Sequence, residues 1–282
     1  LGGAGNVVHN ILSLGAEPVP VGFTGDDDAG ARIRKLFEDI GVDTSLLYGV
    51  KGFTTPRKSR ILSGRDNSRK QQVLRIDYLN RSTPEGSEYQ KLGDRIMDLA
   101  GKCDLLLVSD YLKESVTAEL FSDITATRKD LITIVDSREN LMKFKGASYV
   151  TPNEPEIRNL FPSNKLRSGG DFLRAGRQLM EGIGCRGVVQ KRGHQGMIVF
   201  DRGKDPIFLP IHGSAESVVV TGAGDTVIAL LSLSLASGLD LADSARISNV
   251  GASIVVMKEG AYPLKPEELD SEMAAALSGQ NR

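Results

Sequence analysis

The sequence has little cysteine and histidine and no tryptophan. Its two cysteines, Cys103 and Cys185, lie far apart with no Cys-x-x-Cys spacing, and its three histidines form no metal-ligand pattern. A disulfide framework and a zinc site are therefore not expected. We expect a protein of a reduced, cytoplasmic compartment.

An excess of charge and a long apolar run are also missing. The formal net charge of -1 gives no general electrostatic reason to expect nucleic acid or an anionic membrane as a partner. The longest apolar run, residues 227–236, is too short and too often interrupted by serine to cross a bilayer. We therefore expect neither a nucleic-acid partner nor a membrane partner.

The start of the chain lacks an initiator methionine and a leader. Leu1-Gly2-Gly3 is typical of the middle of a fold, so we expect natural sequence upstream of Leu1. The 282 residues suffice for one large α/β domain, or for two small domains, with a buried core.

Helical and strand patterns alternate over most of the chain. We expect helices at 7–14, 31–40, 88–100, 117–128, 154–160, 171–180, 225–236 and 241–257, the last two closing the chain. We expect strands at 18–23, 105–109, 131–136, 149–150, 187–190, 197–200, 207–211 and 218–220. This alternation predicts an α/β fold with a mostly parallel central sheet and helices on both faces.

Residues 46–79 have a different composition, in which β-formers alternate with polar residues. We assign this segment to a small β lid and residues 1–45 and 80–282 to the α/β core. Ligands of parallel sheets bind beyond the carboxyl ends of the strands. Polar residues follow the expected strands at these ends: Asp110 with Tyr111, Asp136, Asn153 with Glu156, Lys191, and residues 222–225.

The turn before the helix at 225–236 carries the strongest functional signal. Gly222, Ala223 and Gly224 follow a β-branched run, and two glycines let consecutive backbone N–H groups face one anion at the positive end of the helix dipole. Asp225 could then accept the proton of a hydroxyl that attacks a phosphoryl group. The alternative is an ordinary helix start with an acidic residue in its first turn.

A second glycine turn stands at the start of the chain. Gly2 and Gly3 precede a helical pattern, so bare backbone there can approach a sugar or a phosphate, and Asn6 can donate to a hydroxyl. The alternative is a packing turn. Three adjacent aspartates at 26–28 fit a helix cap better than a metal site.

Basic residues are concentrated between positions 57 and 75. The segment contains Arg57, Lys58, Arg60, Arg65, Arg69, Lys70 and Arg75 against Asp66 alone. Arginine binds phosphate in a bidentate manner, so this concentration suits a substrate that already carries a phosphate, and Gln71 and Gln72 suit hydroxyls. The alternative is an exposed sheet face kept soluble by charge.

Asn153 and Glu156 lie at i and i+3 of a predicted helix start. Their oxygens can meet on one face and hold Mg²⁺ through water, although the same pair fits a capping box. Lys191 opens a hairpin that contains Gly193 and Gly196, and its ammonium reaches either a nucleotide phosphate or solvent. Asn249 stands among small residues, where it could flank an adenine.

Together these residues resemble the ribokinase-like (PfkB) carbohydrate kinases. Gly2-Gly3 with Asn6 is similar to the sugar-binding glycine motif of that family, and residues 22–30 are similar to its G-x-D-x-x-G segment. Asn153 with Glu156 resembles the N-x-x-E motif for magnesium and phosphate. Residues 221–225 resemble the G-A-G-D motif, which supplies the anion hole and the catalytic base.

Within that family, four stretches resemble the heptose 7-phosphate kinases: residues 71–78, 107–111 with Lys113, 149–153 and 221–228. The resemblance implies ATP-dependent phosphorylation of the anomeric hydroxyl of D-glycero-D-manno-heptose 7-phosphate, and the family's first strand is expected upstream of Leu1. Glu114 and Ser137-Arg138 depart from the subfamily pattern. The alternatives are a kinase for fructose, ribose or 2-keto-3-deoxygluconate, or a non-catalytic sugar or nucleotide sensor.

The expected site follows from these patterns. Asp225 is the base, with Gly222, Ala223 and Gly224 as the anion hole. The sugar phosphate contacts Gly2, Gly3, Asn6, Arg60, Gln72, Arg75 and Asp110. ATP contacts Asn153, Lys191, Gly193, Gly196 and Asn249, and Asn153 and Glu156 hold Mg²⁺ through water. We also expect a homodimer formed through the lid.

Overall fold

The computed structural model describes residues 1–64, 71–79, 84–111, 116–162, 166–213, 222–258 and 260–278. Its backbone contacts divide the chain into two compact units, one of residues 1–18 and 97–282 and one of residues 19–96. Each unit is described by itself. The segment predicted as a lid, residues 46–79, lies within the second unit.

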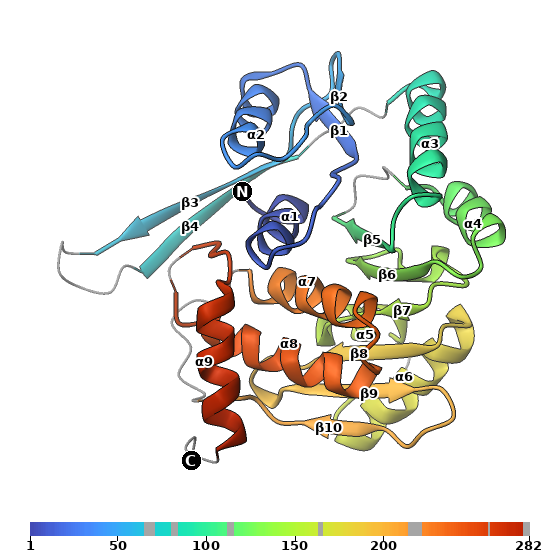
Figure 1. Cartoon of the computed structure of the whole chain (residues 1–282), viewed down its shortest axis with the longest axis vertical. Coiled ribbons are helices and arrows are strands. Elements are labelled where there is room, and N and C mark those ends of the chain that lie inside the picture. Colours follow the sequence, from blue (N-terminus) through green and yellow to red (C-terminus); the bar gives the residue numbers. More distant parts are fainter. Residues whose placement is uncertain are drawn as a thin grey trace. The chain divides into compact units, whose positions relative to one another are not determined.

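The first unit is built on a six-stranded sheet (Figure 1). Its strands are β5 (Leu105–Asp110), β6 (Ile132–Ser137), β7 (Tyr149–Val150), β8 (Gly187–Lys191), β9 (Met197–Asp201) and β10 (Ile207–Leu209), in the order β10-β9-β8-β7-β6-β5. Strands β5 to β8 are parallel to one another. Strand β9 is antiparallel to β8, and β10 is antiparallel to β9. This order confirms the predicted mostly parallel sheet.

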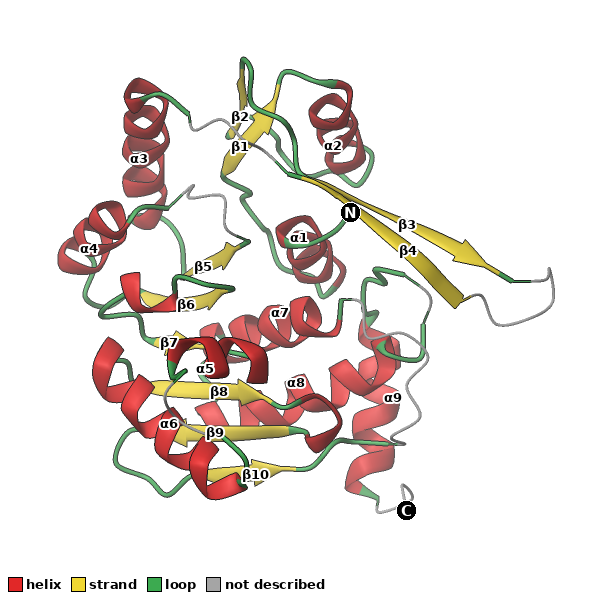
Figure 2. Ribbon diagram, turned by 180° about the vertical axis from the view of Figure 1, so that it is seen from behind, coloured by secondary structure: helices red, strands yellow, loops and turns green. Residues whose placement is uncertain are grey.

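Helices cover both faces of this sheet (Figure 2). Helices α5 (Glu154–Leu160) and α6 (Gly169–Ile183) lie on one face, and α7 (Ala223–Ala236) and α8 (Leu241–Val255) lie on the other. Helix α7 is buried along nearly its whole length, which explains why its sequence is apolar on every side. Its serine at 232 donates to the Ile228 carbonyl and so needs no other partner.

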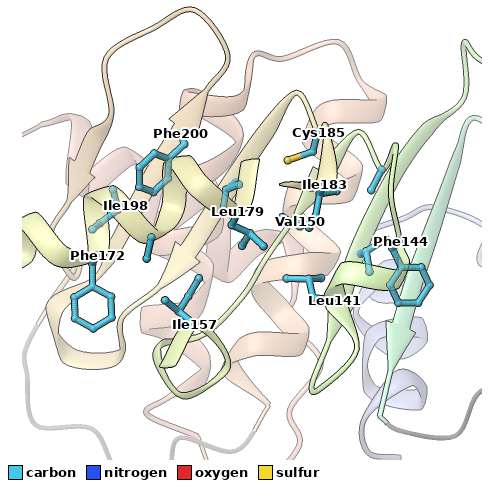
Figure 3. Close-up of a cluster of buried hydrophobic side chains, with 14 of the residues drawn as sticks. Leu141, Phe144, Val150, Ile157, Phe172, Leu179, Ile183, Cys185, Ile198 and Phe200 are labelled. Atoms are coloured by element: carbon cyan, nitrogen blue, oxygen red, sulfur yellow. The ribbon is translucent and has the colours of Figure 1, made fainter. Parts of the chain in front are cut away.

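The core between α6 and the sheet is closely packed (Figure 3). Phe172 and Leu179 of α6 are buried against Ile198 and Phe200 of β9. A Cβ atom at Gly176 would lie 2.2 Å from the Phe200 ring, so glycine is required where the helix crosses this strand.

Among the described residues of the first unit, three further α-helices pack around this core. Helix α1 (Ala4–Ser13) packs on α7, α4 (Ala118–Thr127) follows β5, and α9 (Pro266–Leu277) packs on α8. The prediction that the chain closes with the helix at 241–257 is wrong, because α9 follows it. The start signals of α9 were present in the sequence: Pro266 is its first residue, and acidic residues fill its first turn.

The second unit contains a parallel pair, β1 (Gly22–Gly25) with β2 (Leu47–Val50), helix α2 (Asp28–Glu38), and an antiparallel ribbon of β3 (Arg57–Ser63) and β4 (Gln71–Tyr78). Helix α3 (Gly86–Ala100) follows the ribbon in sequence. The strand predicted at 18–23 forms later, at β1, because the prolines at 18 and 20 cannot donate to a ladder.

Helix α2 begins with a side-chain cap. Asp27 accepts hydrogen bonds from the Gly30 amide at 2.8 Å and from the amide and hydroxyl of Thr55 at 2.9 and 2.6 Å. This arrangement confirms the capping interpretation of the aspartate run. Within the described ranges, no group of three or more His, Cys, Asp or Glu side chains is arranged to hold a metal ion.

Helices long and apolar enough to cross a membrane are absent from the part of the chain that the structure describes. The strand predicted at 218–220, together with Thr221, Arg65, Arg69, Lys70, Lys113 and Glu114, lies outside the described residues.

Candidate active site

The N-terminus of α7 is shaped by Gly222, its N-cap residue. Gly222 has φ 92°, in the left-handed region, and a Cβ atom there would lie 2.9 Å from the Asn6 amide nitrogen. Glycine is therefore required by both backbone conformation and space. The first N–H groups of α7 have no partner within the helix, and Gly222 provides no side-chain cap. The turn can therefore bind an anion.

Asp225 lies in the first turn of α7 and is only 6 % exposed. Its Oδ2 atom accepts a hydrogen bond from Asn6 Nδ2 of α1 at 2.9 Å. Its Oδ1 atom accepts one from the hydroxyl of Tyr111, the residue directly after β5, at 2.8 Å. The structure thus brings Asn6 and Asp225 together.

The environment of Asp225 changes its acidity. Burial raises the pKa of Asp225, the hydrogen bonds from Asn6 and Tyr111 oppose this rise, and the nearby charge of Asp136 adds to it. A carboxylate with a raised pKa is a better proton acceptor than an exposed aspartate. Burial and the charge of Asp225 raise the pKa of Tyr111, so that its hydroxyl stays protonated and donates.

Asn6 is held in place by Asn10, one turn later in α1. Asn10 Nδ2 donates to the Asn6 carbonyl at 2.9 Å, and its Oδ1 accepts from the Thr226 hydroxyl at 3.2 Å and from the Leu264 amide at 3.1 Å. Asn10 therefore ties α1 to the start of α7. Our sequence reasoning missed it, although an asparagine four residues after Asn6 lies on the same helix face.

Lys191 and Asp136 form an ion pair at the carboxyl ends of β8 and β6. Lys191 Nζ lies 2.7 Å from Asp136 Oδ1, which also accepts from the Thr151 hydroxyl at 2.9 Å. A Cβ atom at Gly224 would lie 3.8 Å from Lys191 Nζ. The ammonium group therefore lies beside the first turn of α7, and its side chain is only 14 % exposed. Our sequence reasoning noted Asp136 without giving it a role.

Asn153 and Glu156 form a complete capping box at the start of α5. Asn153 Oδ1 accepts from the Glu156 amide at 2.9 Å, and Glu156 Oε2 accepts from the Asn153 amide at 2.8 Å. Asn153 Nδ2 also donates to Glu156 Oε1 at 2.7 Å. The capping alternative is therefore realised, with three hydrogen bonds between the two residues.

The same pair is suited to a hydrated cation. Glu156 is buried, and burial raises its pKa to about 6; the charge of Lys191 lowers the pKa, and the charge of Asp136 raises it. The carboxylates of buried Glu156 and half-buried Asp136 repel each other, and each has lone pairs left for further bonds. Such a pair fits a divalent cation that keeps its water shell. The residues present therefore fit Mg²⁺ held through water.

The glycine turn at the chain start contacts Tyr111. Gly3 is the N-cap residue of α1 with φ 54°, and a Cβ atom there would lie 3.4 Å from the Tyr111 ring. A Cβ atom at Gly2 would meet nothing within 4 Å. Gly3 thus allows the bare backbone of this turn to pack beside the aromatic ring.

Other predicted residues have partners of their own. Asp110 accepts from the Ser137 hydroxyl at 3.0 Å and pairs with Lys143 at 3.2 Å. Asn249 Nδ2 donates to the Pro210 carbonyl at 2.6 Å.

The hairpin glycines lie in the β8–β9 connection, which the structure confirms as a hairpin. Gly193 and Gly196 both have positive φ. A Cβ atom at Gly196 would lie 2.0 Å from the Leu209 carbonyl oxygen, so this glycine is required for packing against β10.

Arg60, Gln72 and Arg75 lie on the ribbon of the second unit, where they are exposed. Arg60 is the direct cross-strand partner of Arg75. Arg75 Nε pairs with Asp77 at 2.9 Å, and Lys58 pairs with the same carboxylate at 2.9 Å. Like charges opposite each other destabilise a ribbon, so a bound anion would relieve their repulsion.

Known proteins resemble this chain over almost its whole length. The sequence profile of the family described as "pfkB family carbohydrate kinase" matches residues 1–268. The bifunctional protein HldE of Trichlorobacter lovleyi is 35% identical over 285 residues, which cover 100% of this chain and 56% of that protein. The bifunctional protein HldE of Geobacter sulfurreducens is 32% identical over 272 residues, which cover 95% and 54%. The chain thus spans about half the length of the curated relatives it matches.

Solved structures share the fold at lower sequence identity. Arabidopsis thaliana ribokinase, complexed with ribose and ATP, is 19% identical with a TM-score of 0.80, over 97% of this chain and 87% of that one. Phosphofructokinase-2 from Escherichia coli, in complex with fructose-6-phosphate, is 18% identical with a TM-score of 0.73, over 97% and 86%. The fold is therefore ribokinase-like.

Proposed function

The chain belongs to the pfkB family of carbohydrate kinases, and from this we propose that it transfers the γ-phosphoryl group of ATP to the anomeric hydroxyl of D-glycero-D-manno-heptose 7-phosphate. The observation that carries the proposal is the buried carboxylate of Asp225, held by Asn6 and Tyr111 at an uncapped helix N-terminus. A proton acceptor and an anion-binding turn are two of the groups that this reaction requires.

In the proposed reaction, the sugar hydroxyl oxygen attacks the γ-phosphorus. A bond forms between this oxygen and the phosphorus, the bond from the γ-phosphorus to the bridging oxygen breaks, and ADP leaves. Asp225 accepts the hydroxyl proton. The N–H groups of Ala223 and Gly224 face the developing negative charge, because the first N–H groups of a helix have no intrahelical partner.

We assign ATP binding to Lys191, Gly193, Gly196 and Asn249. The ammonium of Lys191 lies beside the first turn of α7, where a phosphate would bind. Asn153 and Glu156 would hold Mg²⁺ through water. When bound, this ion neutralises phosphate charge.

The choice of a phosphorylated sugar is supported by the ribbon of the second unit. Arg60 and Arg75 face each other across the strands, and we propose that they bind the 7-phosphate while Gln72 donates to hydroxyls. In the first unit, we assign Gly2, Gly3, Asn6 and Asp110 to the sugar.

The ribbon is also the basis of two further proposals. We propose that residues 46–79 act as a lid and that they join two copies of the chain, because Ile61, Leu62, Val73 and Leu74 are about half exposed there. The reaction consumes ATP, and we place it in the cytoplasm.

The substrate is tested by coupled ADP release with ATP and Mg²⁺. We expect kcat/KM to be about 100-fold higher for heptose 7-phosphate than for unphosphorylated heptose, ribose, fructose or 2-keto-3-deoxygluconate, since two arginine–phosphate contacts are lost without the phosphate. Arg60→Glu should raise KM for the phosphorylated sugar about 10-fold or more.

Arg32→Glu makes the same charge change on the exposed surface of α2 and serves as the control, with no expected effect. Turnover restricted to an unphosphorylated sugar would contradict the proposed substrate. If none of these sugars supports ADP release, a non-catalytic sugar or nucleotide sensor would be favoured.

A further inference from the structure

Tyr111 donates a hydrogen bond to Asp225, yet no step of the proposed reaction involves Tyr111. We propose that Tyr111 is a positioning residue, which holds the Asp225 carboxylate in the orientation that accepts the proton of the sugar hydroxyl. This inference rests on the proposed role of Asp225 as the base. Tyr111 orients the carboxylate, and Asp225 itself accepts the proton.

The geometry of the two donors carries the inference. Asn6 Nδ2 donates to Oδ2 at 2.9 Å, and the Tyr111 hydroxyl donates to Oδ1 at 2.8 Å. An aspartate carboxylate held at one oxygen still rotates broadly about its Cβ–Cγ bond. One fixed donor on each oxygen stops this rotation, and each oxygen keeps a further lone pair for the substrate.

The Tyr111 ring is itself supported. The bare backbone of Gly3 packs beside it, since a Cβ atom there would lie only 3.4 to 3.7 Å from three ring atoms. The Arg138 guanidinium carbon lies 5.5 Å from the centroid of the same ring, within cation–π distance. The start of α1 therefore contributes to both hydrogen bonds. Gly3 contacts the ring of the donor Tyr111, and Asn6 is the other donor to Asp225.

The groups around Asp225 predict how removal of the Tyr111 hydroxyl changes the pKa of Asp225. Asp136 at the end of β6 raises the pKa of Asp225, and Lys191 at the end of β8 lowers it. Burial is the largest influence and raises the pKa, while the hydrogen bonds from Asn6 and Tyr111 lower it. Loss of the Tyr111 hydroxyl therefore leaves a carboxylate that is more mobile and more readily protonated.

The test is Tyr111→Phe, which removes the hydroxyl and keeps the ring. The control is Tyr149→Phe, the same change at a half-buried tyrosine of β7. We expect Tyr111→Phe to lower kcat by about 10- to 100-fold, to leave KM for ATP within about twofold, and to move the acid limb of the kcat–pH profile to higher pH. Tyr149→Phe should change none of these.

A second readout requires no substrate. The ¹³C chemical shift of the Asp225 carboxyl carbon, assigned by comparison with Asp225→Asn, reports its titration directly. We expect the midpoint to rise in Tyr111→Phe and to stay constant in Tyr149→Phe. An equal midpoint and an unmoved pH profile in an active Tyr111→Phe enzyme would overturn the role of Tyr111 alone. Absence of sugar phosphorylation by the unaltered chain would overturn the proposed function, and the positioning role with it.

Discussion

Asp225 combines its proposed role as the base with an unfavourable environment for a charge. Its carboxylate is buried, and the pKa is raised above the value of an unfolded chain. Such a group contributes stability in its protonated form below the unfolded pKa, and that contribution is lost as the pH rises through the folded pKa. At neutral pH the ionised carboxylate therefore lowers the free energy of unfolding.

Asp225→Asn should consequently not destabilise the fold at pH 7.5. The new amide oxygen can accept from Asn6, and the new amide nitrogen can donate to the Tyr111 hydroxyl, which also accepts. We expect a free energy of unfolding equal to that of the unaltered chain or about 1 kcal/mol higher, with the difference shrinking as the pH falls toward 4. Thermal unfolding of both proteins between pH 4 and pH 7.5 measures this difference in the free energy of unfolding.

Asp205→Asn is the matched control, because Asp205 is exposed and the same exchange there should leave the melting temperature unchanged. A loss of more than about 1 kcal/mol in Asp225→Asn at pH 7.5 would show that the ionised carboxylate stabilises the fold, contrary to the sign derived from its burial.

Single residues of the candidate site were predicted better than their contacts. Gly222, Asp225 and Asn6 were predicted from local spacing, because each stands at a glycine turn before a helix. Their partners Tyr111 and Asn10 were not assigned a role. Tyr111 reaches Asp225 across 114 residues and Asn6 reaches it across 219, so these contacts are set by the packing of α1 and β5 against α7 rather than by local patterns.

At the scale of elements, local signals located most helices of the first unit. The predicted helix at 154–160 agrees with α5, whose capping box fixes its start. Helix α9 was missed because its apolar positions are weakly periodic, although Pro266 marked its start. The contact of Gly176 in α6 with the Phe200 ring could not be predicted, because nothing in the local sequence indicates which distant side chain a helical glycine faces.

Gly176→Ala tests the packing of α6 on β9. The added methyl group would lie 2.2 Å from the Phe200 ring in a filled core, so we expect a loss of about 1 to 3 kcal/mol in the free energy of unfolding. Gly170→Ala in the same helix is the control. Its Cβ atom would meet nothing closer than 3.7 Å, and alanine there should be neutral or stabilising by up to about 1 kcal/mol.

Urea unfolding of both variants gives the comparison. Equal free energies of unfolding for Gly176→Ala and the unaltered chain would mean that α6 can move away from β9 without a loss of stability. This result would contradict the close packing of α6 in Figure 3.

At the scale of the whole chain, alternation predicted the fold class but not the strand order. The pattern of helices and strands predicts parallel strands, and β5 to β8 follow it. The order in which they pair, and the antiparallel addition of β9 and β10, depend on side-chain packing between distant segments. The division into residues 19–96 and the remainder likewise depends on tertiary contacts, whereas the composition change pointed only to residues 46–79.

We propose that this chain phosphorylates a sugar with Asp225 as the base. The most direct measurement is ³¹P NMR of a reaction of the chain with ATP, Mg²⁺ and heptose 7-phosphate, run in parallel with Asp225→Asn. We expect a new anomeric phosphate signal in step with ADP formation, and a rate about 10² to 10⁴ lower in the variant. An unchanged rate in Asp225→Asn would contradict the role of Asp225 as the base, and no transfer to the sugar by the unaltered chain would contradict the proposed activity.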